Sequence, residues 1–167
     1  SGSKVKLADT RKTTPGLRVF EKYAFRCGGG INHRLGLDDA AMLKENHIEW
    51  SKGIKESIKI LKKTNPWTTK IIVEAETPTQ AKEAVEAGAD GVLLDEMSIL
   101  DIKKLVPELR QLSKSSNSTY VSQNIVIEVS GINPNNLSDY IFTGIDLIST
   151  SAPITKSKWI DFSMRFN

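Results

Sequence analysis

Cationic side chains gather among glycines and threonines in the first 34 residues of this chain. They are Arg11, Lys12, Arg18, Arg26, His33 and Arg34. Cations set among small residues are typical of an anion site, because a guanidinium group holds a carboxylate or a phosphate through two parallel hydrogen bonds. Glycines also end helices, and an isolated basic pair is usually solvated, so each feature alone is weaker evidence. Together they predict a place where an anion is bound.

The elements that must position these side chains alternate along the chain. Apolar runs predict strands, and apolar residues at helical spacing predict helices between them. The predicted strands cover residues 5–9, 40–44, 70–76, 91–95, 125–131 and 146–152, and the predicted helices 17–27, 51–64, 77–89, 98–112 and 133–144, with a polar loop at 113–120. Strands that alternate with helices over short connections indicate a parallel sheet with crossover helices.

Polar residues follow one predicted strand after another. Arg11 and Lys12, Lys44, Glu76, Asp95, Ser130 and Gly131, and Ser151 and Ala152 stand at these strand ends. Because the carboxyl ends of parallel strands meet at one edge of the sheet, where α/β enzymes place their active sites, we expect these residues to surround one site.

The stretch "VEAE" predicts a pair of carboxylates on one face of a strand. Side chains alternate along a strand, so Ile72, Glu74 and Glu76 share a face, and Val73 and Ala75 take the other. If the first face points into a barrel, both glutamates enter its interior, where a carboxylate needs a cation or a metal. The alternative is an edge strand with both glutamates in water.

Length and composition limit the classes of protein. A chain of 167 residues predicts one domain, which we assign to residues 6–167, with residues 1–5 as a linker or tag remnant. The net charge of +3 is too small to indicate a nucleic-acid partner, and no apolar run approaches the roughly 18 residues of a membrane span. One cysteine, Cys27, cannot form an internal disulfide, which predicts a cytoplasmic protein.

The fold class expected from this pattern is α/β, with a parallel (β/α) barrel that is open or incomplete. Six predicted strands in 167 residues are fewer than a complete eight-stranded barrel of about 250 residues requires. An open doubly wound sheet remains an alternative, because composition does not separate the two.

Long stretches of the sequence closely resemble quinolinate phosphoribosyltransferases, the carboxylating nicotinate-nucleotide pyrophosphorylases. The run "ADTRKTTPGLRVFEKYAFRCGGGINHRLGLDDAAMLKENHI" carries the resemblance, which continues through "VEAET", "AGADGVLLDE", "IEVSG" and "DFSMRF". It implies the C-terminal barrel domain of the family, without the N-terminal sandwich domain. Members of this family form homodimers (or hexamers). The sandwich domain of one subunit covers the barrel mouth of the other and supplies an arginine to its substrate. The isolated barrel is therefore expected to bind ligands weakly or to be inactive.

The resemblance also implies a reaction and a set of site residues. Such enzymes join quinolinate to phosphoribosyl pyrophosphate with Mg²⁺, and release pyrophosphate and carbon dioxide to give nicotinate mononucleotide in NAD biosynthesis. The implied quinolinate pocket is formed by Arg11, His33, Arg34 and Lys44, with Lys12 near the phosphates. Glu76 and Asp95 would face the ribose and the metal and act with Lys44 in catalysis. Ser130, Gly131, Ser151 and Ala152 would hold the 5′-phosphate.

Two segments depart from the family pattern. The phosphate loop reads "SGINP", with Ile132 where a small or polar residue is common, and "SAPITKS" places Thr155 and Lys156 where many members have a histidine. Two other functions remain open: a related barrel of the molybdenum-uptake type that acts on a different aromatic acid, and a non-catalytic barrel that binds phosphosugars.

Overall fold

Six parallel strands form the centre of the protein. The computed structural model describes residues 4–115 and 124–166. Its strands are β1 (Lys6–Ala8), β2 (Ala41–Leu43), β3 (Ile71–Ala75), β4 (Gly91–Asp95), β5 (Val126–Ser130) and β6 (Leu147–Ser149). They lie in the order β1-β6-β5-β4-β3-β2, so β1 and β2 are the two edges of an open sheet. The predicted parallel α/β class and all six predicted strands are confirmed.

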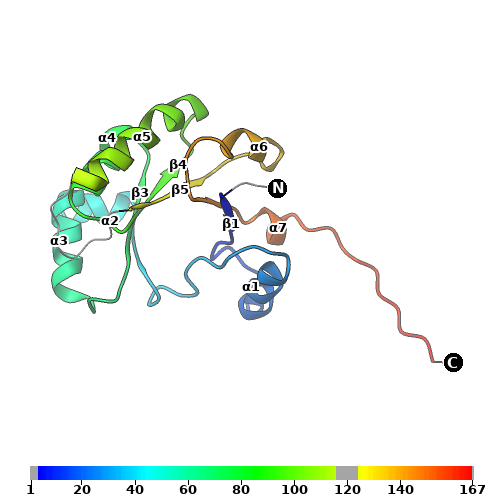
Figure 1. The fold of residues 1–167 in the computed structure, drawn as a ribbon. Helices are drawn as coiled ribbons and strands as arrows, with labels where there is room; N and C mark the ends of the chain where they lie inside the picture. The colour runs from blue at the N-terminus through cyan, green and yellow to red at the C-terminus, as the bar shows by residue number, and fades with distance from the viewer. Residues whose placement is uncertain (1–3, 116–123, 167) are drawn as a thin grey trace.

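Helices follow the strands as expected for crossover connections. They are α1 (Arg18–Cys27), α2 (Glu45–Trp50), α3 (Ile54–Thr64), α4 (Pro78–Glu86), α5 (Ile99–Ser115), the short 3₁₀ helix η1 (Pro134–Asn136), α6 (Leu137–Tyr140) and α7 (Ala152–Thr155). Helices α3, α4 and α5 gather on one side of the strands, whereas α1 lies apart from them, below β1 in Figure 1. Within the described residues, no helix is both long and apolar enough to cross a membrane.

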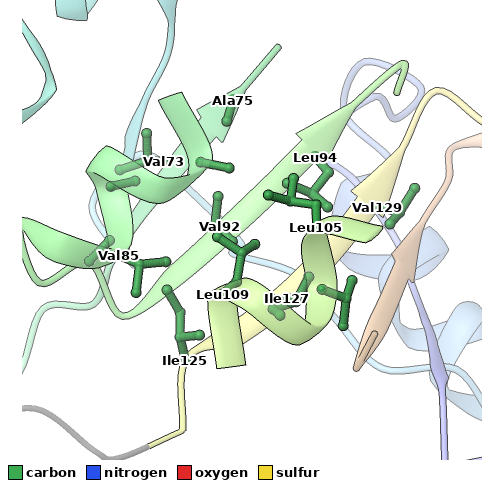
Figure 2. Close-up of a cluster of buried hydrophobic side chains, with 14 of the residues drawn as sticks. Val73, Ala75, Val85, Val92, Leu94, Leu105, Leu109, Ile125, Ile127 and Val129 are labelled. Atoms are coloured by element: carbon green, nitrogen blue, oxygen red, sulfur yellow. The ribbon is translucent and has the colours of Figure 1, made fainter. Parts of the chain in front are cut away.

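The two faces of the sheet have different chemistry. Val73, Val92, Leu94, Ile127 and Val129 point toward α4 and α5 and form the buried core (Figure 2). Each such side chain, when fully buried, stabilises the fold by about 1.5–3 kcal/mol. The residues between them in sequence lie on the opposite face, because strand side chains alternate. That second face is therefore free to carry polar groups.

Several element boundaries differ from the sequence-based expectation. Helix α2 was not predicted, and Ser51 ends it instead of starting the next helix, because its hydroxyl donates to the carbonyl of His47. The following helix begins only at Ile54, after Lys52 and Gly53 turn the chain with positive φ angles.

The carboxyl-terminal half shows three more differences. Helix α5 continues through Pro107 to Ser115, so the predicted loop begins within a helix, and residues 116–120 of that loop lie outside the described residues. The predicted helix at 133–144 is a 3₁₀ turn followed by one turn of α-helix. Ala152 begins α7 and does not end the last strand.

The start of α4 is fixed by a reciprocal cap. The Thr77 hydroxyl accepts from the backbone N–H of Gln80 at 3.2 Å, and the Gln80 side chain accepts from the N–H of Thr77 at 3.1 Å. This cap orients a helix that packs directly on β3 and β4.

Replacing Thr77 with alanine is expected to lower the free energy of unfolding by about 1 kcal/mol, because one backbone N–H of the first turn loses its partner. Urea denaturation followed by circular dichroism measures this change. Thr64→Ala in α3 is the control, since its hydroxyl only donates back to Ile60. Equal unfolding energies for the two variants would contradict this account of the cap.

Candidate active site

The polar face of the sheet carries a cavity of about 360 Å³ that we call the basic cavity. Its lining includes most of the residues singled out in the sequence. These are Arg11, Lys12, His33, Arg34, Lys44, Asp95 and Ser130. They come from the ends of four strands and from the irregular segment between α1 and β2. The expectation that the strand ends surround one site therefore agrees with the geometry.

A second cavity, of about 320 Å³, adjoins the first, and we call it the loop cavity. It is lined by Ser130 and Gly131 after β5 and by Ser151 and Ala152 after β6. Lys12 and Lys156 also line it. Lys12, Asp95 and Ser130 belong to both cavities, so a ligand that bridges them would contact all three.

Glu76 lies outside both cavities, as do Arg18 and Arg26 of the cationic cluster. Its side chain is exposed, one residue beyond the end of β3. Glu74, two residues earlier on the same face, lines the basic cavity instead. The strand ends sooner than expected, so only one of the two carboxylates of "VEAE" enters the interior, and the catalytic role of Glu76 stays a prediction.

Cations and carboxylates alternate around the basic cavity. The Lys44 ammonium donates to a carboxylate oxygen of Glu74. The Arg34 guanidinium donates to the carbonyl of Ala40 at 3.0 Å. Burial lowers the pKa of Arg34, and the positive charge of Arg11 lowers it further. The negative charge of Glu74 raises this pKa, but by a smaller amount. Two arginines that destabilise one another's charge are a favourable setting for an anion, which would relieve the repulsion.

The loop cavity has a backbone suited to an anionic group. Ser130 donates its hydroxyl hydrogen to the Asp95 carboxylate, which joins the ends of β5 and β4. Gly131 has a φ of +71°, and a Cβ at this position would lie 2.6 Å from Cγ of Glu96. Only glycine fits this turn, which agrees with the predicted position of a phosphate loop.

A buried ion pair that the sequence patterns did not reveal holds the irregular segment in place. The ammonium of Lys22 lies 2.6 Å from the carboxylate of Asp9, and their side chains are 3% and 0% exposed. Asp9 also accepts from the backbone N–H of His33 at 2.7 Å and from Asn32, while Lys22 donates to the carbonyl of His33 at 3.0 Å. The sequence held one sign of this pair. Lys22 stands three residues before Phe25, so the two share a face of α1, and they are its two buried residues.

His33 links this ion pair to Glu128, a second residue that the sequence patterns did not single out. Nε2 of His33 lies 3.2 Å from a Glu128 carboxylate oxygen, and Nδ1 accepts the backbone N–H of Arg34 at 2.8 Å. A nitrogen that accepts a hydrogen bond carries no proton, so Nε2 is the ring nitrogen that donates to Glu128. The signal for Glu128 was its place two residues before Ser130, on the same strand face.

Comparison with known proteins agrees with this site. The family model "Quinolinate phosphoribosyl transferase, C-terminal domain" matches residues 1–165. The chain belongs to this family. The resemblance seen in the sequence motifs is thereby confirmed, and the family model spans the residues that line both cavities.

Individual relatives show the same relation. A probable carboxylating nicotinate-nucleotide pyrophosphorylase of Synechocystis is 42% identical over 96% of this chain and 52% of that protein. The human carboxylating nicotinate-nucleotide pyrophosphorylase is 32% identical over 95% of this chain and 51% of that protein. The crystal structure of NadC from Streptococcus pyogenes matches with a TM-score of 0.85 at 37% identity, over 98% of this chain and 53% of that one. The chain therefore spans about half the length of the relatives it matches.

Replacing Lys22 with methionine is expected to destabilise the fold by about 3–5 kcal/mol, because it leaves the Asp9 carboxylate buried without its cation. Lys59→Met in α3 is the matched control: its ion pair with Glu56 is exposed, with side chains 74% and 50% accessible. This control should change the unfolding free energy by less than about 1 kcal/mol. Chemical denaturation measures both, and equal effects would show that burial of the Lys22 pair is not what matters.

Proposed function

We propose that this chain is the catalytic half of a carboxylating nicotinate-nucleotide pyrophosphorylase, which joins quinolinate to phosphoribosyl pyrophosphate and releases pyrophosphate and carbon dioxide. The observation that carries this proposal is the meeting of Arg11, Arg34 and Lys44 in one cavity that adjoins a glycine-containing loop cavity. A dicarboxylate fits the first cavity and a sugar phosphate fits the second. The names of the relatives agree with this assignment.

The residues of the basic cavity fit the chemistry of such a transfer. Arg11 and Arg34 would hold the two carboxylates of quinolinate through charge-assisted hydrogen bonds. Displacement of pyrophosphate from the ribose passes through a state with positive charge on the sugar, and fixed carboxylates stabilise such charge. Glu74 and Asp95 are placed for this, and Lys44 holds Glu74 in position. Glu74 thus joins the predicted catalytic residues Lys44, Asp95 and Glu76.

The loop cavity fits the phosphates. Backbone N–H groups after β5 and β6 and the ammonium groups of Lys12 and Lys156 would face the 5′-phosphate, with Lys156 in place of the histidine common in the family. Among the described residues, no cluster of three or more metal-binding side chains occurs. Asp95 alone, together with phosphate oxygens, fits Mg²⁺, which often binds through one or two carboxylates plus substrate phosphates. Magnesium would neutralise charge on the departing pyrophosphate.

The wider setting completes the proposal. The protein works in the cytoplasm, as its single cysteine suggests, and it acts as a homodimer or a larger assembly of a longer protein. An arginine from the sandwich domain of another subunit would then complete the basic cavity. The molybdenum-uptake type of barrel would prefer another aromatic acid over quinolinate, and a non-catalytic barrel would bind the phosphosugar alone.

Replacing Arg34 with alanine is expected to weaken quinolinate binding by at least about 10-fold, because a charged hydrogen-bonding partner in a partly buried site is lost. Calorimetric titration of the wild-type chain and the variant measures this. Arg26→Ala is the control, since Arg26 is exposed on α1 and lines neither cavity. If the wild-type chain binds phosphoribosyl pyrophosphate but not quinolinate, the proposed function is wrong.

Replacing Gly131 with alanine is expected to weaken phosphoribosyl pyrophosphate binding about 5-fold or more while quinolinate binding is kept, because the added Cβ forces the loop away from Glu96. Gly29→Ala is the control: Gly29 has a φ of +88°, but open space surrounds its Cβ position. Both variants carry similar backbone strain, so only a loss of phosphosugar affinity specific to Gly131→Ala supports the loop as a phosphate site. Equal affinities would refute it.

A further inference from the structure

Glu128 lies on the polar face of the sheet, further from the carboxyl ends of the strands than Asp95, the acid predicted from the sequence. The register pairs Glu128 with Leu93 and pairs Ser130 with Asp95, so Glu128 is two residues further from the carboxyl edge of the sheet. It lines both the basic cavity and a neighbouring cavity of about 560 Å³, yet the residue is only 3% exposed. A carboxylate at this depth needs hydrogen-bonding partners, because burial removes its contact with water.

Only one of the two carboxylate oxygens of Glu128 has a partner. Oε2 accepts from Nε2 of His33, while Oε1 is buried and has no hydrogen bond. His33 cannot turn to serve both oxygens, because Arg34 donates to its Nδ1 and the Asp9–Lys22 pair holds its backbone. The free oxygen is therefore a buried acceptor, fixed in position, on a residue that lines the basic cavity.

A second buried polar atom without a partner lines the same cavity. Among the described side chains, Nε of Arg11 is the other buried group that lacks a hydrogen bond. It is a donor, whereas Oε1 of Glu128 is an acceptor. A ligand that contacted both would present an acceptor to Arg11 and a donor to Glu128. A pyridine-2-carboxylate protonated on its ring nitrogen has this pattern, because its N–H lies next to its carboxylate.

We propose that Glu128 binds the ring nitrogen of the pyridine substrate and holds its proton, while Arg11 binds the neighbouring 2-carboxylate. This assignment rests on the proposed function and adds a residue to it. The nitrogen reacts when its proton moves to Oε1 of Glu128 and the N–H electron pair stays on nitrogen. That pair forms the bond to the ribose carbon while the bond from this carbon to pyrophosphate breaks and pyrophosphate leaves with the electrons. The proton then held by Glu128 balances the one that C2 needs after carbon dioxide leaves. Glu128 is thus both a substrate contact and a proton acceptor.

Calorimetry with two ligands tests this assignment on the wild-type chain. Quinolinate and phthalate carry the same two adjacent carboxylates, but phthalate has no ring nitrogen. Titrations at pH 7 in two buffers of different ionisation enthalpy measure the protons taken up on binding. We expect quinolinate to bind with uptake of up to about one proton, because a nearby carboxylate favours the protonated nitrogen, and phthalate to bind with none. Equal proton uptake for the two ligands would overturn the proposal.

Glu128→Gln is expected to abolish this uptake and to weaken quinolinate at least about 10-fold, while phthalate changes by less than about 2-fold. Glu128→Asp keeps the carboxylate and should restore part of the proton uptake. Glu49→Gln, at an exposed position on α2, is the control.

If Glu128→Gln weakens the binding of both ligands equally, Glu128 is structural and this inference fails while the proposed function stands. If the wild-type chain binds neither dicarboxylate, the proposed function itself fails. Should Glu128→Gln not fold, the wild-type comparison of the two ligands decides alone.

Discussion

Asp9 and Lys22 form an ion pair that is almost completely removed from water, and the polar face of the protein depends on it. Removing one member of such a pair leaves an uncompensated buried charge, which costs far more than the loss of a surface ion pair. The pair holds both backbone polar groups of His33. It thereby fixes a segment without regular structure across the open side of the sheet, between the edge strands β1 and β2. Arg34 and the ring of His33 take their positions from this segment.

The open sheet divides its two faces between stability and chemistry. Val73, Val92 and Ile127 point to α4 and α5 and supply the apolar core (Figure 2). Their neighbours in sequence point the other way, so core and cavity are made by the same few residues of each strand. In β4, for example, Asp95 lines the basic cavity while Val92 and Leu94 lie in the core.

Charge in the cavity is arranged before any ligand arrives. Burial and the charge of Arg11 lower the pKa of Arg34, and Glu74 offsets this only in part. An incoming dianion therefore gains more from this site than from separate surface arginines. The carboxylates of Glu74, Asp95 and Glu128 are each held by a partner, Lys44, Ser130 and His33 respectively. Such fixed groups would need little reorganisation if positive charge developed on the sugar proposed as a substrate.

The sequence by itself determined the alternation of strands and helices, the convergence of the strand ends, and most of the site, because these follow from periodicity and from motifs around Arg11, Arg34 and Lys44. It did not determine which glutamate of "VEAE" enters the cavity, since that depends on where β3 ends. Only the tertiary structure decided that Asp9, Lys22, His33 and Glu128 form one hydrogen-bonded chain. Lys22 lies on α1, Glu128 on β5, Asp9 directly after β1, and His33 on an irregular segment. No local pattern records which buried charges will meet when such elements pack together.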